Sequence, residues 1–123
     1  MGTLKELIQE AHSLIPKISC NEFSNNKDKF FVIDVREASE IQETGMIECA
    51  TNIPRGLIEM KLTPGENDLD VNTPIAVYCG GGSRASLAGK TLKDLGFKNV
   101  QNLEGGYRGW KKFTEKTIGV KLK

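Results

Sequence analysis

Two short apolar runs that do not alternate with polar residues constrain the fold of this chain more than any other feature. The first covers residues 30–35 (Phe-Phe-Val-Ile-Asp-Val) and the second covers residues 75–78 (Ile-Ala-Val-Tyr). Runs of this length, rich in β-branched and aromatic residues, are typical of strands buried on both faces. Because such strands occur in parallel sheets with helices on both sides, the two runs predict an α/β fold.

Helical segments separate these runs from each other and from shorter strand candidates. Amphipathic spacing predicts a helix over 4–15 that ends at Pro16, and a second one over 83–95. Shorter helices are expected after Ser19 and over 38–44, 57–62 and 110–116, with brief strands at Ile18, 51–53 and Val100. Strands that alternate with helices predict a single α/β domain with a mainly parallel central sheet of about five strands.

The length and charge of the chain limit its domain organisation and its partners. The 123 residues suit one domain, 1–123, with 1–16 as an N-terminal helical extension and 117–123 as a basic tail. Seventeen basic and 16 acidic residues give a net charge of +1. This balance argues against nucleic-acid or membrane binding, and no apolar run approaches the ~18 residues of a membrane helix. We read no secretion signal in residues 1–10.

The cysteines and the single histidine argue against structural cross-links. Cys20, Cys49 and Cys79 are odd in number and irregular in spacing, so they do not form a disulfide framework and indicate the reducing cytoplasm. His12 has no partner at metal-ligand spacing, so we expect no metal and no cofactor.

The segment from Tyr78 to Ala85 carries the strongest indication of chemistry. Cys79 follows a buried strand directly, three glycines come next, and a helix begins at Ser83. Ligands of parallel α/β sheets bind beyond the carboxyl ends of the strands, and a glycine-rich turn before a helix N-terminus gathers backbone N–H donors. We therefore predict an anion-binding loop with a nucleophilic sulfur at its base. Its binding residues would be Gly80, Gly81, Gly82, Ser83 and Arg84.

Three motifs in this chain resemble the single-domain form of the rhodanese family of sulfurtransferases. The first is the six-residue loop 79–84, which is similar to the active loop of that family. The second joins Asp-Val-Arg-Glu at 34–37 to Gly-Met-Ile-Glu-Cys-Ala at 45–50 and Asn-Ile-Pro at 52–54, with Met46 where the family usually has histidine and Cys49 where it usually has glycine. The third is 103–110, Leu-Glu-Gly-Gly-Tyr-Arg-Gly-Trp. The resemblance implies a rhodanese-like α/β domain.

The resemblance also implies a reaction. The Cys79 thiolate would take the outer sulfur of a small anionic donor such as thiosulfate, and cyanide, a thiol or a protein acceptor would then remove that sulfur from the Cys79 persulfide. The loop leaves the choice between thiosulfate and mercaptopyruvate open, because it begins with Cys-Gly and ends with arginine. A non-catalytic persulfide carrier or docking module is the alternative. Phosphatases and arsenate reductases of this fold have five residues between cysteine and arginine, whereas this chain has four.

Other polar residues near the predicted strand ends are candidates for a supporting role. Asp34 and Arg36 follow the first strand and favour a structural ion pair that holds the strand to its loop. Arg55 is either a residue of the pocket mouth or a surface residue. Cys20 and Cys49 would be resolving thiols only if they lay near Cys79, and Trp110 is expected in the core.

Overall fold

The computed structural model of the chain describes residues 3–117 and contains one five-stranded sheet. The strands are β1 (Lys17–Ile18), β2 (Phe31–Asp34), β3 (Thr51–Asn52), β4 (Ile75–Tyr78) and β5 (Val100–Leu103). They follow the order β1-β5-β4-β2-β3, and every neighbouring pair is parallel. The predicted α/β fold with a parallel central sheet is therefore confirmed.

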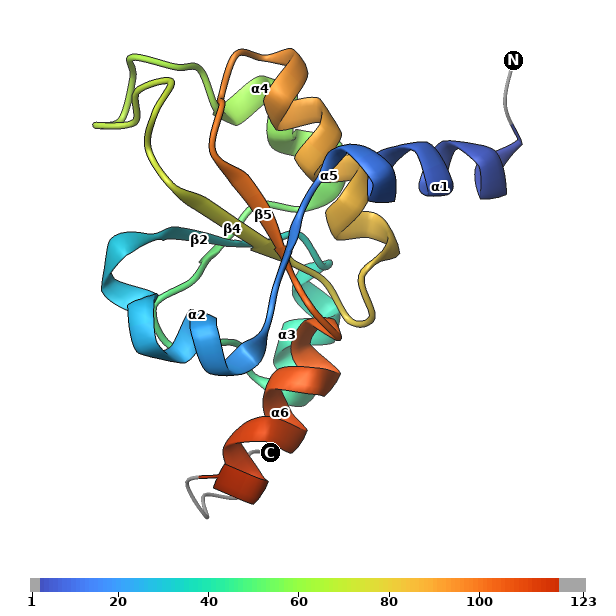
Figure 1. Ribbon diagram of the computed structural model, residues 1–123, viewed down its shortest axis with the longest axis vertical. Coiled ribbons are helices and arrows are strands. Elements are labelled where there is room, and N and C mark those ends of the chain that lie inside the picture. The colour runs from blue at the N-terminus through green and yellow to red at the C-terminus, as the bar shows by residue number, and fades with distance from the viewer. Residues whose placement is uncertain (1–2, 118–123) are drawn as a thin grey trace.

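Helices cover both faces of this sheet (Figure 1). The α-helices are α1 (Leu4–Leu14), α2 (Cys20–Asn26), α3 (Ala38–Thr44), α4 (Ile58–Lys61), α5 (Ser83–Asp94) and α6 (Gly106–Thr117). Short 3-10 helices occupy Lys27–Lys29 (η1) and Arg55–Leu57 (η2). One face carries α1, α4 and α5, and the other carries α2 and α6. The predicted basic tail lies outside the described residues, apart from the backbone of Thr117.

The core consists of two apolar clusters, one on each face of the sheet. Alternate residues of the buried strands serve the two clusters, so that Ile75 and Val77 face α5 whereas Ala76 and Tyr78 face α6. All four residues of β4 are buried, as the uninterrupted apolar run predicts. The sheet is thus held on both sides, and the carboxyl ends of its strands meet at one edge.

Two helices differ from their sequence-based descriptions. The last helix was expected at 110–116 but begins at Gly106, because its first N–H groups bond to carbonyls of the Cys79 loop. The helix expected over 83–95 is α5, which ends at Asp94 with Leu95 as its C-cap, and its buried side chains are small apart from Leu92. Gly89 of this helix packs against Ile15, the C-cap residue of α1. A Cβ at position 89 would lie 3.0 Å from the Ile15 side chain, which favours glycine there.

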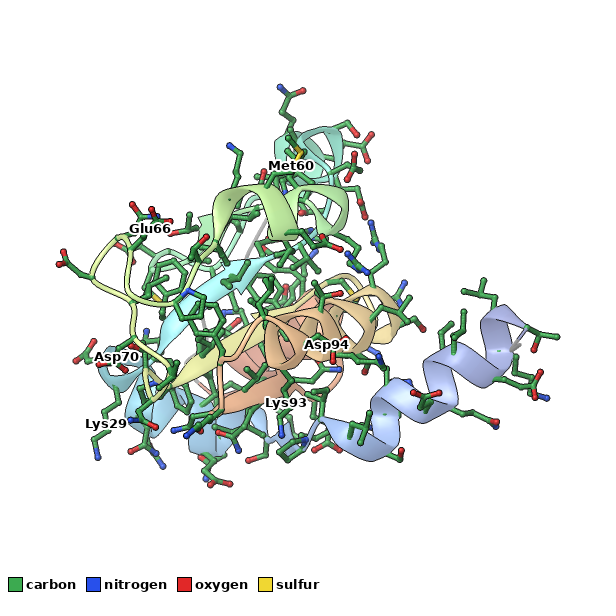
Figure 2. All side chains as sticks on the ribbon, turned by 90° about the horizontal axis from the view of Figure 1, so that it is seen from above. Lys29, Met60, Glu66, Asp70, Lys93 and Asp94 are labelled. Atoms are coloured by element: carbon green, nitrogen blue, oxygen red, sulfur yellow. The ribbon has the colours of Figure 1, made fainter. Side chains whose placement is uncertain are left out.

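The segment between β3 and β4, which includes η2 and α4, connects the two strands along the periphery of the molecule. Met60 on α4 is 83% exposed, and Figure 2 shows it, with Glu66 and Asp70, at the periphery of the molecule. Asn67 and Asp68 adopt positive φ angles in this loop, a conformation that Asn and Asp tolerate better than most residues. Within the described residues, no helix combines the length and the apolarity needed to span a membrane.

Candidate active site

Cys79 lies at the carboxyl end of β4, at the base of the glycine loop. Its side chain is 2% exposed and packs in the cluster that faces α5. The Gly82 N–H donates a hydrogen bond to the Cys79 Sγ over 2.9 Å. The loop therefore turns back towards the sulfur and offers it at least one backbone donor.

The glycine loop presents further N–H groups around this sulfur. Gly82 has a φ of +125°, which favours glycine at the position that caps α5. The N–H groups of Gly80, Gly81, Ser83 and Arg84 have no acceptor among residues 3–117. These donors and the positive end of α5 suit an anionic group next to the sulfur.

The start of α6 closes the other side of the loop. The Tyr107 N–H donates to the Cys79 carbonyl over 2.7 Å, and the Arg108 N–H donates to the Gly80 carbonyl over 3.3 Å. Gly106 makes this approach feasible, because a Cβ there would lie only 2.5 Å from the Cys79 carbonyl oxygen. The Arg108 guanidinium lies directly over Gly81. The sequence singled out the Gly-Gly pair in a motif but did not indicate this contact.

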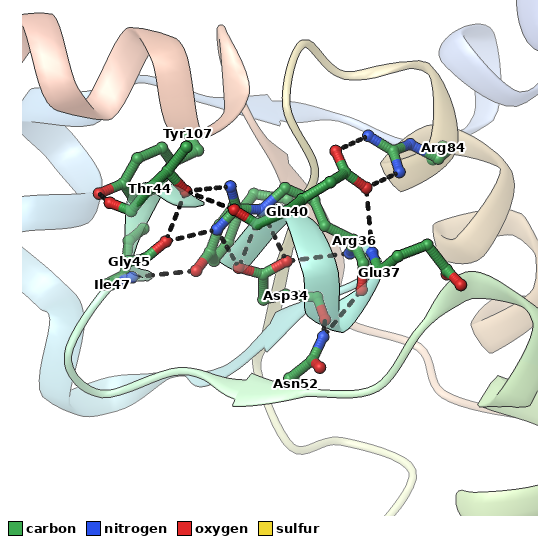
Figure 3. A network of polar contacts seen from close by, with 11 residues as sticks. Asp34, Arg36, Glu37, Glu40, Thr44, Gly45, Ile47, Asn52, Arg84 and Tyr107 are labelled. Atoms are coloured by element: carbon green, nitrogen blue, oxygen red, sulfur yellow. Dashed lines mark hydrogen bonds and ion pairs between the residues drawn. The ribbon is translucent and has the colours of Figure 1, made fainter. Parts of the chain in front are cut away.

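A buried ion pair supports the neighbouring strand end. Asp34 is fully buried and accepts hydrogen bonds from the Nε and Nη2 of Arg36, the latter over 2.8 Å. Arg36 also donates to Thr44 and to the carbonyl of Gly45, and its guanidinium lies 4.5 Å from the ring centre of Tyr107 (Figure 3). Burial alone would lower the pKa of Arg36, but its bonds to Asp34 outweigh this and raise it. Both residues thus hold β2 to α3.

Arg84, the last residue of the loop, is bound to Glu40 of α3. Its two terminal nitrogens donate to the two carboxylate oxygens over 2.5 and 2.8 Å (Figure 3). The hydrogen bonds from Arg84 lower the pKa of Glu40 from 4.5 to about 2, and the carboxylate in turn raises the pKa of Arg84. Sequence analysis did not find this pair, because the two residues are 44 positions apart.

A second polar network approaches the loop from β5 and α1. The buried Asn102 donates from its Nδ2 to the Gly82 carbonyl over 3.2 Å and to the Ser86 Oγ over 2.8 Å. The Ser86 Oγ lies 2.6 Å from the His12 Nδ1. The Asn102 Oδ1 has no partner among the described residues. The network therefore positions the carbonyl group of Gly82, the residue whose N–H donates to the Cys79 sulfur.

Among the described residues, the remaining sequence candidates form no hydrogen bond or ion pair with the loop 79–84. Arg55 is half-buried and lies 3.5 Å from Glu59, one turn further along the chain. Cys49 is exposed and Cys20 half-buried, where burial raises the thiol pKa of Cys20, and both are free thiols. Among residues 3–117 no group of His, Cys, Asp and Glu side chains could hold a metal. A pocket of about 210 Å³ opens beside the loop, lined by Arg36, Glu40, Glu43, Thr44, Gly80, Tyr107 and Arg108.

Comparison with known proteins identifies the family. Residues 19–113 match the sequence model of the rhodanese-like domain family. The chain belongs to the rhodanese-like domain family. Relatives of this family include a sulfur carrier protein and a sulfurtransferase.

Two relatives and one solved structure show the range of rhodanese-like proteins that the chain resembles. It is 36% identical over 109 residues to the "Putative sulfur carrier protein YrkF" of Bacillus subtilis, covering 86% of this chain and 56% of that protein. It is 34% identical over 79 residues to a sulfurtransferase of Allochromatium vinosum, covering 64% of this chain and 69% of that protein. A Rhodopseudomonas palustris structure described as a possible tyrosine phosphatase has a TM-score of 0.79 and 25% identity, covering 100% of this chain and 96% of that one.

Proposed function

We propose that this protein is a sulfurtransferase that moves a sulfane sulfur from a small anionic donor such as thiosulfate to cyanide or a thiol through a persulfide on Cys79. The observation that carries the proposal is the Cys79 sulfur at the base of the glycine loop, 2.9 Å from the Gly82 nitrogen, in a loop where the N–H groups of Gly80, Gly81, Ser83 and Arg84 have no acceptor among residues 3–117. Such donors stabilise a sulfur anion, a persulfide and a departing oxyanion alike.

The reaction has two half-reactions at the same sulfur atom. The Cys79 thiolate attacks the outer sulfur of thiosulfate, the bond between the two thiosulfate sulfurs breaks, and its electron pair leaves with sulfite. Cys79 then carries a persulfide anion. Cyanide or a thiolate attacks the outer sulfur of that persulfide, and the electron pair of the broken bond restores the Cys79 thiolate. Ping-pong kinetics are expected. In this proposal residues 80–84 bind the donor, and Asp34 and Arg36 support the loop from β2.

The compartment and the acceptor follow from the same chemistry. All three cysteines are free, which supports a reducing compartment such as the cytoplasm, where a persulfide is handed to thiols. The acceptor is a thiol or a protein cysteine. The small net charge of +1 supports neither a nucleic-acid nor a membrane partner.

The intact mass of the protein after incubation with thiosulfate tests the proposal. Wild-type protein should gain about 32 Da, the mass of one sulfur atom. Cys79→Ser should gain nothing, while Cys49→Ser and Cys20→Ser, which change the other free thiols, should react like the wild type. A gain of the same size in Cys79→Ser would refute the assignment of the nucleophile.

Turnover then separates the enzyme from the two alternatives. A sulfurtransferase releases thiocyanate from cyanide over many cycles, whereas a carrier or docking module does not. The carrier alternative is favoured by the likeness to YrkF. Phosphatase chemistry is the alternative suggested by the R. palustris structure. Hydrolysis of an aryl phosphate that depends on Cys79, without any mass gain from thiosulfate or mercaptopyruvate, would replace our proposal by that one.

A further inference from the structure

The ion pair between Arg84 and Glu40 occupies the arginine on which an anionic donor would rely. Both terminal nitrogens of the guanidinium already bond to the two oxygens of one carboxylate, over 2.5 and 2.8 Å. A guanidinium presents such a two-point face to carboxylates and to tetrahedral oxyanions alike. The Arg84 Nη2 is nevertheless close to the loop, since a Cβ on Gly80 would lie 3.6 Å from it. The carboxylate therefore takes a position that the oxyanion of a donor would otherwise use.

The backbone of α3 holds Glu40 in this position. Its Oε1 accepts a hydrogen bond from the Glu37 N–H over 3.0 Å, which forms part of the capping box at the start of the helix. The Glu40 pKa of about 2 keeps the carboxylate charged at any working pH. Side chains of the pair are 40% (Arg84) and 37% (Glu40) exposed, so a dissolved anion reaches both. Glu40 is thus a permanent and accessible competitor for the arginine.

The other charges of the pocket also oppose a small dianion. Asp34 neutralises Arg36 in the core, and Glu43 adds a second carboxylate to the pocket wall next to Glu40. Among residues 3–117, Arg108 is the one arginine of the pocket without a carboxylate partner. A dianion such as thiosulfate meets two carboxylates and one unpaired cation here. A persulfide carried by a thiol has no oxyanion next to its outer sulfur.

We propose that Glu40 determines donor specificity: it withholds Arg84 from small dianions, so the site favours a donor whose sulfane sulfur is carried by a thiol, as in an organic or protein persulfide. In that reaction the Cys79 thiolate attacks the outer sulfur of the persulfide and the donor leaves as its thiolate, so atoms and charge balance. The inference rests on the proposed sulfurtransferase function and revises its donor from thiosulfate to a persulfide. It assigns the donor class and gives Glu40 a role that the loop motif does not contain.

The test compares Glu40→Gln with Glu43→Gln. Both changes remove one negative charge from the same helix and the same pocket, but only the first releases Arg84. Glutamine retains the capping box, so α3 should stay folded. The readout is the rate at which iodoacetamide alkylates Cys79, followed on its peptide by mass spectrometry, with increasing sulfate at constant ionic strength. Sulfate is an unreactive dianion with the shape of thiosulfate.

We expect Glu40→Gln to need about fivefold less sulfate than Glu43→Gln for half-protection, the size of effect that one accessible ion pair allows. The difference should vanish when Arg84 is also changed to Gln. Equal protection in the two single variants would overturn the inference. So would a fivefold gain that persists without Arg84, or protection that depends on Arg108 alone.

The rates of persulfide formation give the second readout. Wild-type protein should react faster with glutathione persulfide than with thiosulfate, and Glu40→Gln should shift this ratio about fivefold towards thiosulfate. An unchanged ratio would overturn the inference while leaving the sulfurtransferase proposal intact. Absence of a Cys79 persulfide with every donor would refute the proposed function instead, and the sulfate measurement would still report whether Glu40 competes for Arg84.

Discussion

Gly106 is the position where a single methyl group should disturb the active loop most. The residue begins α6 with a φ of +61°. A Cβ built there would lie 2.5 Å from the Cys79 carbonyl oxygen and 2.8 Å from the Gly80 carbonyl oxygen. Those two carbonyls are the acceptors for the N–H groups of Tyr107 and Arg108. Gly106→Ala must therefore move α6 away from the loop and weaken both hydrogen bonds.

The cost of this substitution can be worked out from two contributions. A non-glycine residue in the left-handed region loses about 1 kcal/mol. Weakening two backbone hydrogen bonds at the buried floor of the site adds about 1 kcal/mol for each. Gly106→Ala should thus lower the free energy of unfolding by about 2–4 kcal/mol. Because small domains are stable by about 5–15 kcal/mol, the variant should still fold.

Two other glycines separate these contributions. Gly65 has a φ of +94° and nothing within 4 Å of a Cβ, so Gly65→Ala should show the conformational cost of about 1 kcal/mol alone. Gly56 has neither a positive φ nor a neighbour within 4 Å, so Gly56→Ala should change stability by less than about 0.5 kcal/mol. Urea unfolding followed by the fluorescence of the single, buried Trp110 measures all three.

The reasoning would be refuted if Gly106→Ala and Gly65→Ala lost the same stability. Equal losses would mean that the approach of α6 to the Cys79 and Gly80 carbonyls contributes nothing. The alkylation rate of Cys79 gives an independent check, since it should change in Gly106→Ala and stay at the wild-type value in Gly65→Ala. Only the first variant shifts the peptide groups that surround the sulfur.

Two further predictions concern the charged network of Figure 3. Asp34→Asn leaves the buried guanidinium of Arg36 without its carboxylate and should lower the free energy of unfolding by about 3–5 kcal/mol, whereas the exposed control Asp28→Asn should cost less than about 0.5 kcal/mol; similar losses in both would contradict the ion pair. The folded-state pKa of Glu40 lies below its ordinary value of 4.5, at about 2, so its stabilisation is complete above pH 4.5 and is lost as the pH falls towards 2. Acid unfolding of Glu40→Gln should lack this part of the pH dependence, and identical profiles for the variant and the wild type would rule it out.

The sequence predicted those parts of the fold and site that depend on contiguous residues. The runs at 30–35 and 75–78 predicted buried parallel strands, because a strand covered on both faces needs apolar residues at successive positions. The order Cys79, three glycines and a helix predicted the loop, because each property belongs to a neighbouring residue. The start of α6 was missed. The sequence placed this helix at 110–116, and only the carbonyls of a distant loop make Gly106 a helix start.

The long-range polar contacts were not predictable from the sequence. Arg84 was read as an anion binder from its place in the loop, and nothing in its neighbourhood indicated Glu40 as a partner. Asp34 and Arg36 are two residues apart, so their pairing could be proposed, but not the contacts with Thr44 and Tyr107 that enclose the guanidinium. A hydrophobic pattern specifies which side chains are buried. It does not specify which of many charges meet at the edge of the sheet.

The packing of α1 on α5 shows how much of the site's support lies outside the family motif. The match begins at residue 19, yet Ile15 is 1% exposed and belongs to the cluster beneath α5. Gly89 of α5 is shaped to this contact, and His12 lies at hydrogen-bond distance from Ser86, which is bonded to the asparagine that holds the Gly82 carbonyl. Each of these residues looks unremarkable in the sequence: a lone histidine, a serine and a glycine within helices. Their meaning comes from the packing of α1 on α5, so the helix before the motif contributes to the position of the peptide group that contacts the reactive sulfur.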